Sequence, residues 1–169
     1  MAVSAEIKAT LPPRASLTLR MRGNFAIHHL RASTRAAKLA YDVEHNNHDA
    51  PLGAWFDDML QHVPVSVVMA GAALEASANE LIQDILDGST RLPVSLGTKQ
   101  LLKKLIGDRS GNSMGKYEEV SLLFDRPPTK GVRYWQDAEL LVAFRNYFMH
   151  FKPAWEDQKS GPIEVAGLV

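Results

Sequence analysis

The stretch PVSVVMAGAALEASANELIQDILDG, residues 64–88, decides the fold. Its apolar and small residues recur in alternating steps of four and three, and they are Val67, Gly71, Leu74, Ala78, Leu81 and Ile85. This period is typical of an α-helix with a buried face. Pro64 suits the first turn of a helix, and Gly88 provides a stop. The sequence therefore predicts a central helix that begins near Pro64 and ends before Gly88.

A second stripe on the same helix is also largely apolar, although it contains two polar residues. Its members are Val68, Ala72, Glu75, Asn79, Ile82 and Leu86. Because two faces are apolar and many residues are small, other helices can pack closely on more than one side. We therefore expect this helix to lie at the centre of a helical bundle.

Upstream of the central helix, the sequence predicts a strand followed by two helices. Alternating polar and apolar residues over Ser16–Arg22 indicate a short strand. A helix over about residues 24–46, capped by Asn24, follows from the 3-4-3-4 spacing of its apolar stripe. The members of that stripe are Ile27, Leu30, Thr34, Ala37 and Tyr41. After the turn-rich segment His45–Gly53, apolar residues near Trp55 predict a short separate helix.

Downstream, three more helices are predicted. The first contains Leu101–Ile106 and closes at Gly107, and a polar loop over Asp108–Gly115 separates it from the second, at Tyr117–Phe124. The last spans about Tyr134–Phe151 and cannot continue past the proline that follows, at position 153. A short strand near the C-terminus, residues 163–165, could lie beside the first strand. The expected fold class is an all-α, compact bundle of four to five helices with short terminal β-strands.

Composition restricts the chemistry. The chain has 169 residues and no cysteine, which excludes a disulfide scaffold, a thiolate zinc site and a cysteine nucleophile. The formal net charge is zero, but residues 1–40 carry seven Lys or Arg and one acid, whereas residues 41–90 carry nine acids and no Lys or Arg. This distribution fits either internal pairing of basic and acidic segments or a basic face for a polyanion. The excess of Lys and Arg between Lys99 and Arg133 could guide RNA or form a solvated face.

The sequence also bears on location. The longest weakly polar run, Val63–Leu74, ends at Glu75 and is shorter than the roughly 20 residues that span a bilayer. The N-terminus lacks the apolar segment of a secretory signal. We therefore expect a cytoplasmic protein that does not insert into a membrane.

The segment FRNYFMH, residues 144–150, holds the candidate functional residues. Arg145 occupies a position of an otherwise apolar stripe, where a guanidinium needs an anionic partner because unpaired burial costs several kcal/mol. Glu75 is the internal candidate, since it also lies on an apolar stripe. Asn146 and His150 share a helix face, whereas Arg145 and His150 diverge by about 140° at the helical period. Either the last turn distorts, or a second copy of the chain completes the site.

This Arg-Asn-x-x-x-His pattern, together with the AALEASANELI helix at residues 72–82, resembles the signature of HEPN domains. The resemblance covers roughly residues 24–155, with an N-terminal tail at 1–23 and a C-terminal tail at 156–169. It implies an all-helical bundle that forms a homodimer through its motif helices. Many active members are metal-independent endoribonucleases, often toxins with an antitoxin partner or proteins of phage defence. Carried onto this chain, Arg145 and His150 would be catalytic, and Asn146 would orient His150 or the phosphate.

The implied chemistry is RNA cleavage without metal or cofactor. His150 would take the proton of a ribose 2′-hydroxyl or protonate the departing 5′-oxygen, and Arg145 would stabilise the charge on phosphorus. The products would be a 2′,3′-cyclic phosphate and a 5′-hydroxyl. Glu75 and Asn79 would support the site, and Tyr147 could stack on a base or pack in the core or a dimer interface.

Two alternatives remain open at this stage. The chain could be a non-catalytic HEPN module that binds a protein partner or nucleotide through the same surface. It could also be a purely structural dimerisation domain, with Arg145 paired to Glu75 and His150 complementing the helix dipole.

Overall fold

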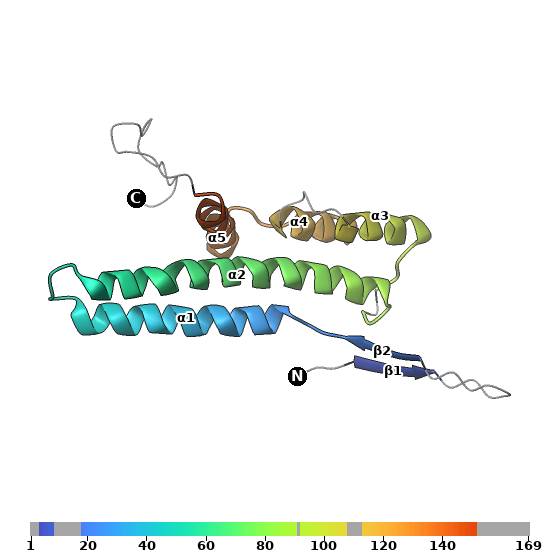
Figure 1. Cartoon of the computed structure of the whole chain (residues 1–169). Coiled ribbons are helices and arrows are strands. Elements are labelled where there is room, and N and C mark those ends of the chain that lie inside the picture. The colour runs from blue at the N-terminus through green and yellow to red at the C-terminus, as the bar shows by residue number, and fades with distance from the viewer. Residues whose placement is uncertain (1–3, 9–17, 91, 108–112, 152–169) are drawn as a thin grey trace.

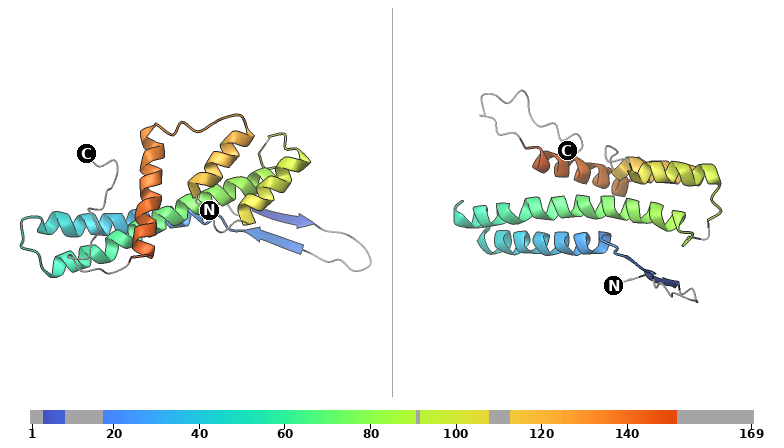
Figure 2. Two further views of the ribbon diagram at one scale, coloured as in Figure 1. Left: turned by 90° about the horizontal axis from the view of Figure 1, so that it is seen from above. Right: turned by 45° about the vertical axis from the view of Figure 1, so that its right-hand side comes forward.

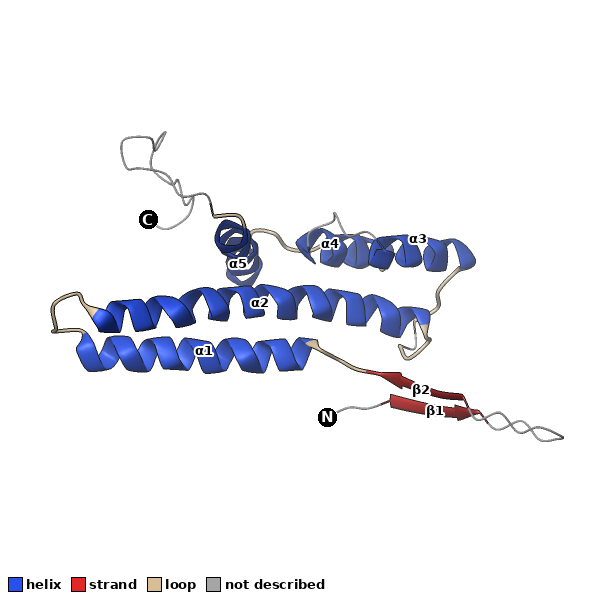
Figure 3. Cartoon of the chain, in the orientation of Figure 1, coloured by secondary structure: helices blue, strands red, loops and turns tan. Residues whose placement is uncertain are grey.

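The computed structural model describes residues 4–8, 18–90, 92–107 and 113–151. The elements are β1 (Ser4–Lys8), β2 (Thr18–Arg22), α1 (Ala26–Asn47), α2 (Ala54–Leu86), α3 (Leu96–Gly107), α4 (Ser113–Leu123) and α5 (Arg133–Met149) (Figure 3). Apart from the two-stranded ribbon, the described part of the chain is built of helices and their connections. The prediction of an all-α fold is therefore confirmed.

Helix α2 is the centre of the molecule. α1 runs antiparallel along one side of α2, and α3, α4 and α5 lie on the opposite side (Figure 1). α5 crosses α2 steeply, whereas α1 lies alongside α2 over nearly the full length of α1 (Figure 2). α2 contacts all four other helices, and α1 contacts no helix other than α2 among the described residues. The prediction that this helix packs on more than one side is confirmed.

Small residues form the contact between α1 and α2. Ser33, Ala36 and Ala40 are the buried residues of α1, and the Ser33 and Ser66 hydroxyls lie 3.5 Å apart. Small side chains let two helix axes come close together. The apolar stripe that predicted this helix is exposed, with exposed fractions of 51% for Leu30 and 60% for Tyr41. Its larger side chains lie on the flank of α1, because the small-residue face makes the closer contact.

α2 is one continuous helix of 33 residues, so the prediction of a short helix followed by a second helix starting at Pro64 is wrong. Pro64 lies inside α2, where it lacks the N–H that would bond to the carbonyl of Leu60. An interior proline costs about 3 kcal/mol of helix stability. Packing against α1 on both sides of Pro64 offsets this local preference.

The hydrophobic core lies at the C-terminal end of α2. Ile82 and Ile85 of α2 pack with Leu102 of α3 and Val120 of α4 in a buried cluster. Ile82 and Leu102 are fully buried, at 0% exposure. Every buried residue of α2 lies at or beyond Gly71. The first half of α2 therefore has α1 beside it but no third helix layer that buries it completely.

Contacts with α2 also set the start of α1. The Ala26 N–H donates to Glu80 Oε1 at 2.9 Å, while no side chain of the N-cap residue, Phe25, caps the helix. The predicted cap by Asn24 is therefore wrong, because a carboxylate from a neighbouring helix takes that role. Arg22 at the end of β2 donates to Asp84 Oδ1 at 2.8 Å and to the Glu80 carbonyl at 3.0 Å, which ties the ribbon to the end of α2.

Two further expectations differ in detail. α4 begins at Ser113, so the predicted loop up to Gly115 was too long at its C-terminal end. β2, the predicted first strand, pairs with β1 in an antiparallel register that places Ser4 opposite Arg22. The predicted strand at residues 163–165 lies outside the described residues.

By length and composition alone, one helix in the described part of the chain, α2, could cross a membrane. A core helix of a soluble protein can meet the same criterion, and 22% of the apolar window of α2 is buried. A location in the cytoplasm stays a prediction.

Candidate functional site

The site is built where α5 crosses α2. Gly71 lies at the crossing, and a Cβ placed on it would lie 2.9 Å from Cγ and 3.2 Å from Cβ of Arg145. Real Cβ atoms do not approach other carbons this closely. The absence of a side chain at Gly71 thus allows the methylene groups of Arg145 to rest on the backbone of α2.

Beyond this contact, the guanidinium of Arg145 meets two groups. Its Nη2 lies 3.8 Å from Glu75 Oε2, so the predicted pair with Glu75 is present. Its Nη1 donates to Asn146 Oδ1 at 3.1 Å. The distance to Glu75 is longer than a hydrogen bond, and 35% of the Arg145 side chain is exposed. Glu75 therefore orients the guanidinium while several of its five N–H donors remain available.

His150 is the C-cap of α5, directly after Met149. Its backbone N–H donates to the Asn146 carbonyl at 3.0 Å, which keeps residue 150 on the path of the helix although its φ of −119° and ψ of 24° are not helical. The residue is exposed, and among the described residues its imidazole makes no hydrogen bond or ion pair. Among the described residues, no hydrogen bond or ion pair joins His150 to Arg145.

Asn79 does not touch Arg145 and instead belongs to a second polar contact one turn further along α2. Its Oδ1 accepts a 2.8 Å hydrogen bond from Lys116 Nζ of α4. Lys116 is only 4% exposed, so the suggestion that it belongs to an RNA-guiding or solvated face is wrong for this residue. Lys99, Lys103 and Lys104 of α3 are exposed, as expected for such a face.

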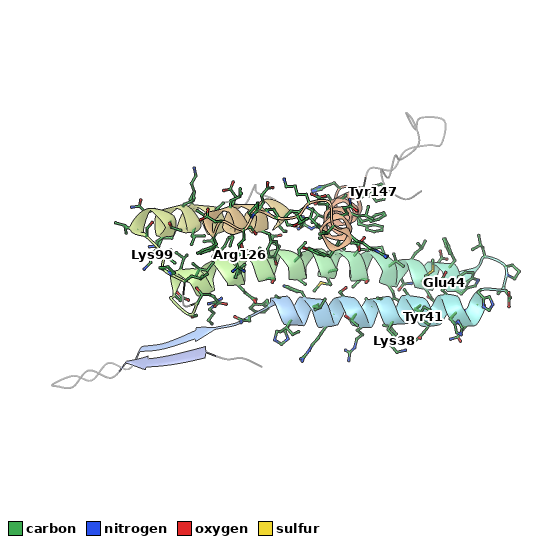
Figure 4. All side chains as sticks on the ribbon, turned by 180° about the vertical axis from the view of Figure 1, so that it is seen from behind. Lys38, Tyr41, Glu44, Lys99, Arg126 and Tyr147 are labelled. Carbon is green, nitrogen blue, oxygen red and sulfur yellow. The ribbon has the colours of Figure 1, made fainter. Side chains whose placement is uncertain are left out.

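Aromatic rings surround the motif on the outer side of α5. Tyr147 packs edge-on against Phe148 at 5.7 Å and against Phe151 at 5.6 Å between ring centroids. Tyr147 and Phe151 remain 45% and 58% exposed, and Met149 is 54% exposed. Figure 4 shows Tyr147 on the side of the molecule that carries α5, away from α1. The motif thus lies next to a patch of exposed apolar side chains.

Ion pairs within the protein connect only some of the basic residues of segment 1–40 with the acidic residues of segment 41–90. Arg22 pairs with Asp84 and Asp87 of the acidic segment. In contrast, Arg31 and Arg35 on α1 form no ion pair within the described residues. No group of three potential metal-ligating side chains occurs in that part of the chain either.

Sequence reasoning located the Arg145–Glu75 pair but missed two features of the site. One is the part played by Gly71, which the sequence showed only as a small member of an apolar stripe. The other is the burial of Lys116, which no periodicity revealed because α4 begins within the predicted loop. Comparison of the chain with protein-family models, curated proteins and solved structures yields no match.

Proposed function

We propose that this protein is a HEPN-like, metal-independent endoribonuclease that acts as a homodimer. The observation that carries the proposal is the setting of Arg145, which combines a fixed stem with a partly free guanidinium. Gly71 fixes the stem, and Glu75 and Asn146 orient the planar group. A preoriented, partly exposed guanidinium is suited to bind a phosphate through two parallel hydrogen bonds.

A purely structural role for Arg145 accounts less well for this arrangement. The Arg145–Glu75 pair is 3.8 Å long, and the two side chains are 35% and 43% exposed. Ion pairs of this kind contribute about 0–1 kcal/mol to stability. A stabilisation this small does not explain why an arginine lies at the crossing of α5 and α2. Binding of an anion by the guanidinium would explain it.

His150 supplies the proton-transfer group in the proposed reaction. One base accepts the proton of the 2′-hydroxyl, the 2′-oxygen forms a bond to phosphorus, and the bond from phosphorus to the 5′-oxygen breaks. An acid protonates the departing 5′-oxygen, which leaves a 2′,3′-cyclic phosphate and a 5′-hydroxyl. Because His150 and Arg145 of one chain diverge, we assign to one phosphate the imidazole of one copy and the guanidinium of the other. That imidazole first accepts the proton of the 2′-hydroxyl and then protonates the departing 5′-oxygen. The exposed side chains of Tyr147, Met149 and Phe151 supply apolar surface for that contact.

The test is cleavage of a fluorescent single-stranded RNA in EDTA by the wild type, His150→Ala and Arg145→Ala. We expect each substitution to slow cleavage by about 10²-fold or more, and an all-deoxy substrate to remain intact. His48→Ala and Arg133→Ala are matched controls, because these residues are an exposed imidazole and an exposed arginine away from the motif, at 63% and 93% exposure. Equal cleavage by the wild type and both motif variants would exclude this function.

Mixing the two inactive variants tests whether two chains share a site. In a composite site, a mixed dimer of Arg145→Ala and His150→Ala retains an intact arginine from one copy and an intact histidine from the other. We expect partial recovery of activity after mixing and re-equilibration. Recovery fails if each chain carries an independent site.

A further inference from the structure

An exposed apolar stripe on α1 is the largest feature that the proposed ribonuclease site does not use. Leu30, Thr34, Ala37 and Tyr41 lie on one flank of α1, spaced three and four residues apart, and all four are exposed. α1 contacts no helix but α2 in the described part of the chain, so no element of this part covers the stripe. α5 and its motif lie on the opposite side of α2 from α1 (Figure 1).

One end of this stripe opens into a mostly apolar cavity of about 830 Å³, whose lining also includes Arg22, Arg31 and Glu80. Leu30 and Ile27 of α1, Leu74 of α2, Tyr117 of α4 and Leu141 of α5 line the cavity. Tyr117 is held in place by a 3.3 Å hydrogen bond from its hydroxyl to the Leu74 carbonyl. The cavity is large enough for an aromatic side chain and lies between elements that α2 holds together.

At the other end of the stripe, Tyr41 projects from the surface. It is 60% exposed, and its ring stacks on His45 at 5.5 Å with 8° between the planes. Figure 4 shows Tyr41 on α1 near Lys38 and Glu44. An apolar cavity at one end of a helix stripe and an exposed aromatic residue at the other make the surface complementary to itself.

We propose that two copies of this chain associate through antiparallel α1 helices, so that Tyr41 of each copy enters the cavity beside Leu30 of the other. In a two-fold antiparallel pair, this register also places Thr34 opposite Ala37 of the partner copy. Small residues at the centre let the two helices approach closely, and the larger residues fill the space at both ends.

The charge on α1 favours the antiparallel direction. The first half of the helix, residues 26–36, contains two arginines and no acid, and the second half, residues 37–47, contains one lysine and two acids. Antiparallel packing therefore brings the basic half of one copy beside the acidic half of the other, whereas parallel packing would join like halves. Arg31, which has no ion-pair partner among the described residues, comes to the level of Ala40 of the second copy, next to an Asp42 that pairs with Lys38 of its own helix at 3.1 Å.

Sedimentation or light scattering of matched variants tests this association. Ala37 and Ala32 are both exposed alanines within α1, but they lie about 140° apart around the helix axis. Because α5 lies on the opposite side of α2 from α1, this contact would join two of the proposed α5 homodimers into a tetramer. We expect Ala37→Arg to halve the molecular mass of that assembly to the mass of the α5 dimer and Ala32→Arg to leave it unchanged. Circular dichroism checks that both variants keep the helical fold. A wild-type monomer, or equal masses for the two variants, would overturn the proposal.

Cross-linking tests the register, because the chain contains no cysteine of its own. We expect a disulfide between Leu30→Cys and Tyr41→Cys proteins when the two are mixed, and none from either protein alone. In the antiparallel register, position 30 lies about 16 Å along the axis from position 30 of the other copy, beyond the roughly 7 Å limit for a disulfide. A disulfide between two Leu30→Cys chains would indicate parallel packing and overturn the assignment. Both experiments are independent of ribonuclease activity.

Discussion

The two halves of α2 differ in how the rest of the protein covers them. From Gly71 onward, α2 lies under α3, α4 and α5, and Ile82 and Ile85 are almost completely buried. Before Gly71, no residue of α2 is buried, and Leu60 and Val65 are 46% and 49% exposed. Both halves are equally helical. Helix formation therefore does not require a complete core here, because one antiparallel partner helix is sufficient to support the first half.

The two sides of α2 also differ in role. The covered half holds the stable core and presents Gly71 and Glu75 to the motif helix. The surface that we assign to self-association lies on α1, and its cavity reaches Leu74 of the same covered half of α2. A helix hairpin with exposed apolar flanks gains stability when a second hairpin packs on it, as in four-helix bundles.

The largest expected difference in unfolding free energy is between two Leu→Ala variants, one in contact with the covered half of α2 and one in the less covered half. Leu102→Ala removes a fully buried side chain packed on the covered half of α2, and we expect it to lower the free energy of unfolding by about 2–5 kcal/mol. Leu60→Ala, at 46% exposure in the other half, should cost no more than about 1 kcal/mol. Urea denaturation in the Ala37→Arg background measures both without a contribution from association through α1. Similar losses of unfolding free energy for the two variants would contradict the conclusion that one half of α2 is buried more completely than the other.

A smaller loss of unfolding free energy is expected when the buried hydrogen bond from Lys116 to Asn79 is removed. Asn79→Leu removes the acceptor that the 4% exposed Lys116 ammonium has among the described residues, and we expect a loss of about 3 kcal/mol in the free energy of unfolding. Lys116→Met removes the buried charge itself and should change stability by less than about 1 kcal/mol, because an apolar side chain of similar length fills the same space. The order of the urea denaturation midpoints of these two variants shows whether the unpaired charge or the missing ammonium destabilises the fold more. A greater loss for Lys116→Met would show that the ammonium stabilises the fold.

The smallest change in stability is expected at the boundary between the halves. Gly71→Ala places a Cβ 2.9 Å from Arg145 Cγ, so α5 must shift, at a cost of about 1–3 kcal/mol. Gly97→Ala is the matched control, because its new Cβ would meet nothing closer than Ser95 Oγ at 3.9 Å and alanine favours the helix. We expect ribonuclease activity to fall for Gly71→Ala by more than the stability loss explains. Unchanged cleavage by that variant would mean that Arg145 need not rest on α2.

Much of the fold follows from local periodicity. The central helix, the helix after the first strand and the motif helix were all predicted from apolar spacing, because that spacing reflects burial of one helix face. The pair between Arg145 and Glu75 was predictable for the same reason, since each charged residue interrupts an apolar stripe. In contrast, the sequence did not show which face of α1 packs on α2, because small residues make that contact and large apolar residues are the stronger signal in a sequence.

The sequence by itself determined the helical class, the order of the helices and the residues of the motif, since each depends on neighbours within a few turns of the chain. Only the tertiary structure decided the continuity of α2 through Pro64, the burial of Lys116, the exposure of the Leu30 stripe and the contact of Gly71 with Arg145. These features depend on which helix packs against which. That choice is made by the summed contacts of residues far apart in the sequence, and these contacts override local preferences of a few kcal/mol.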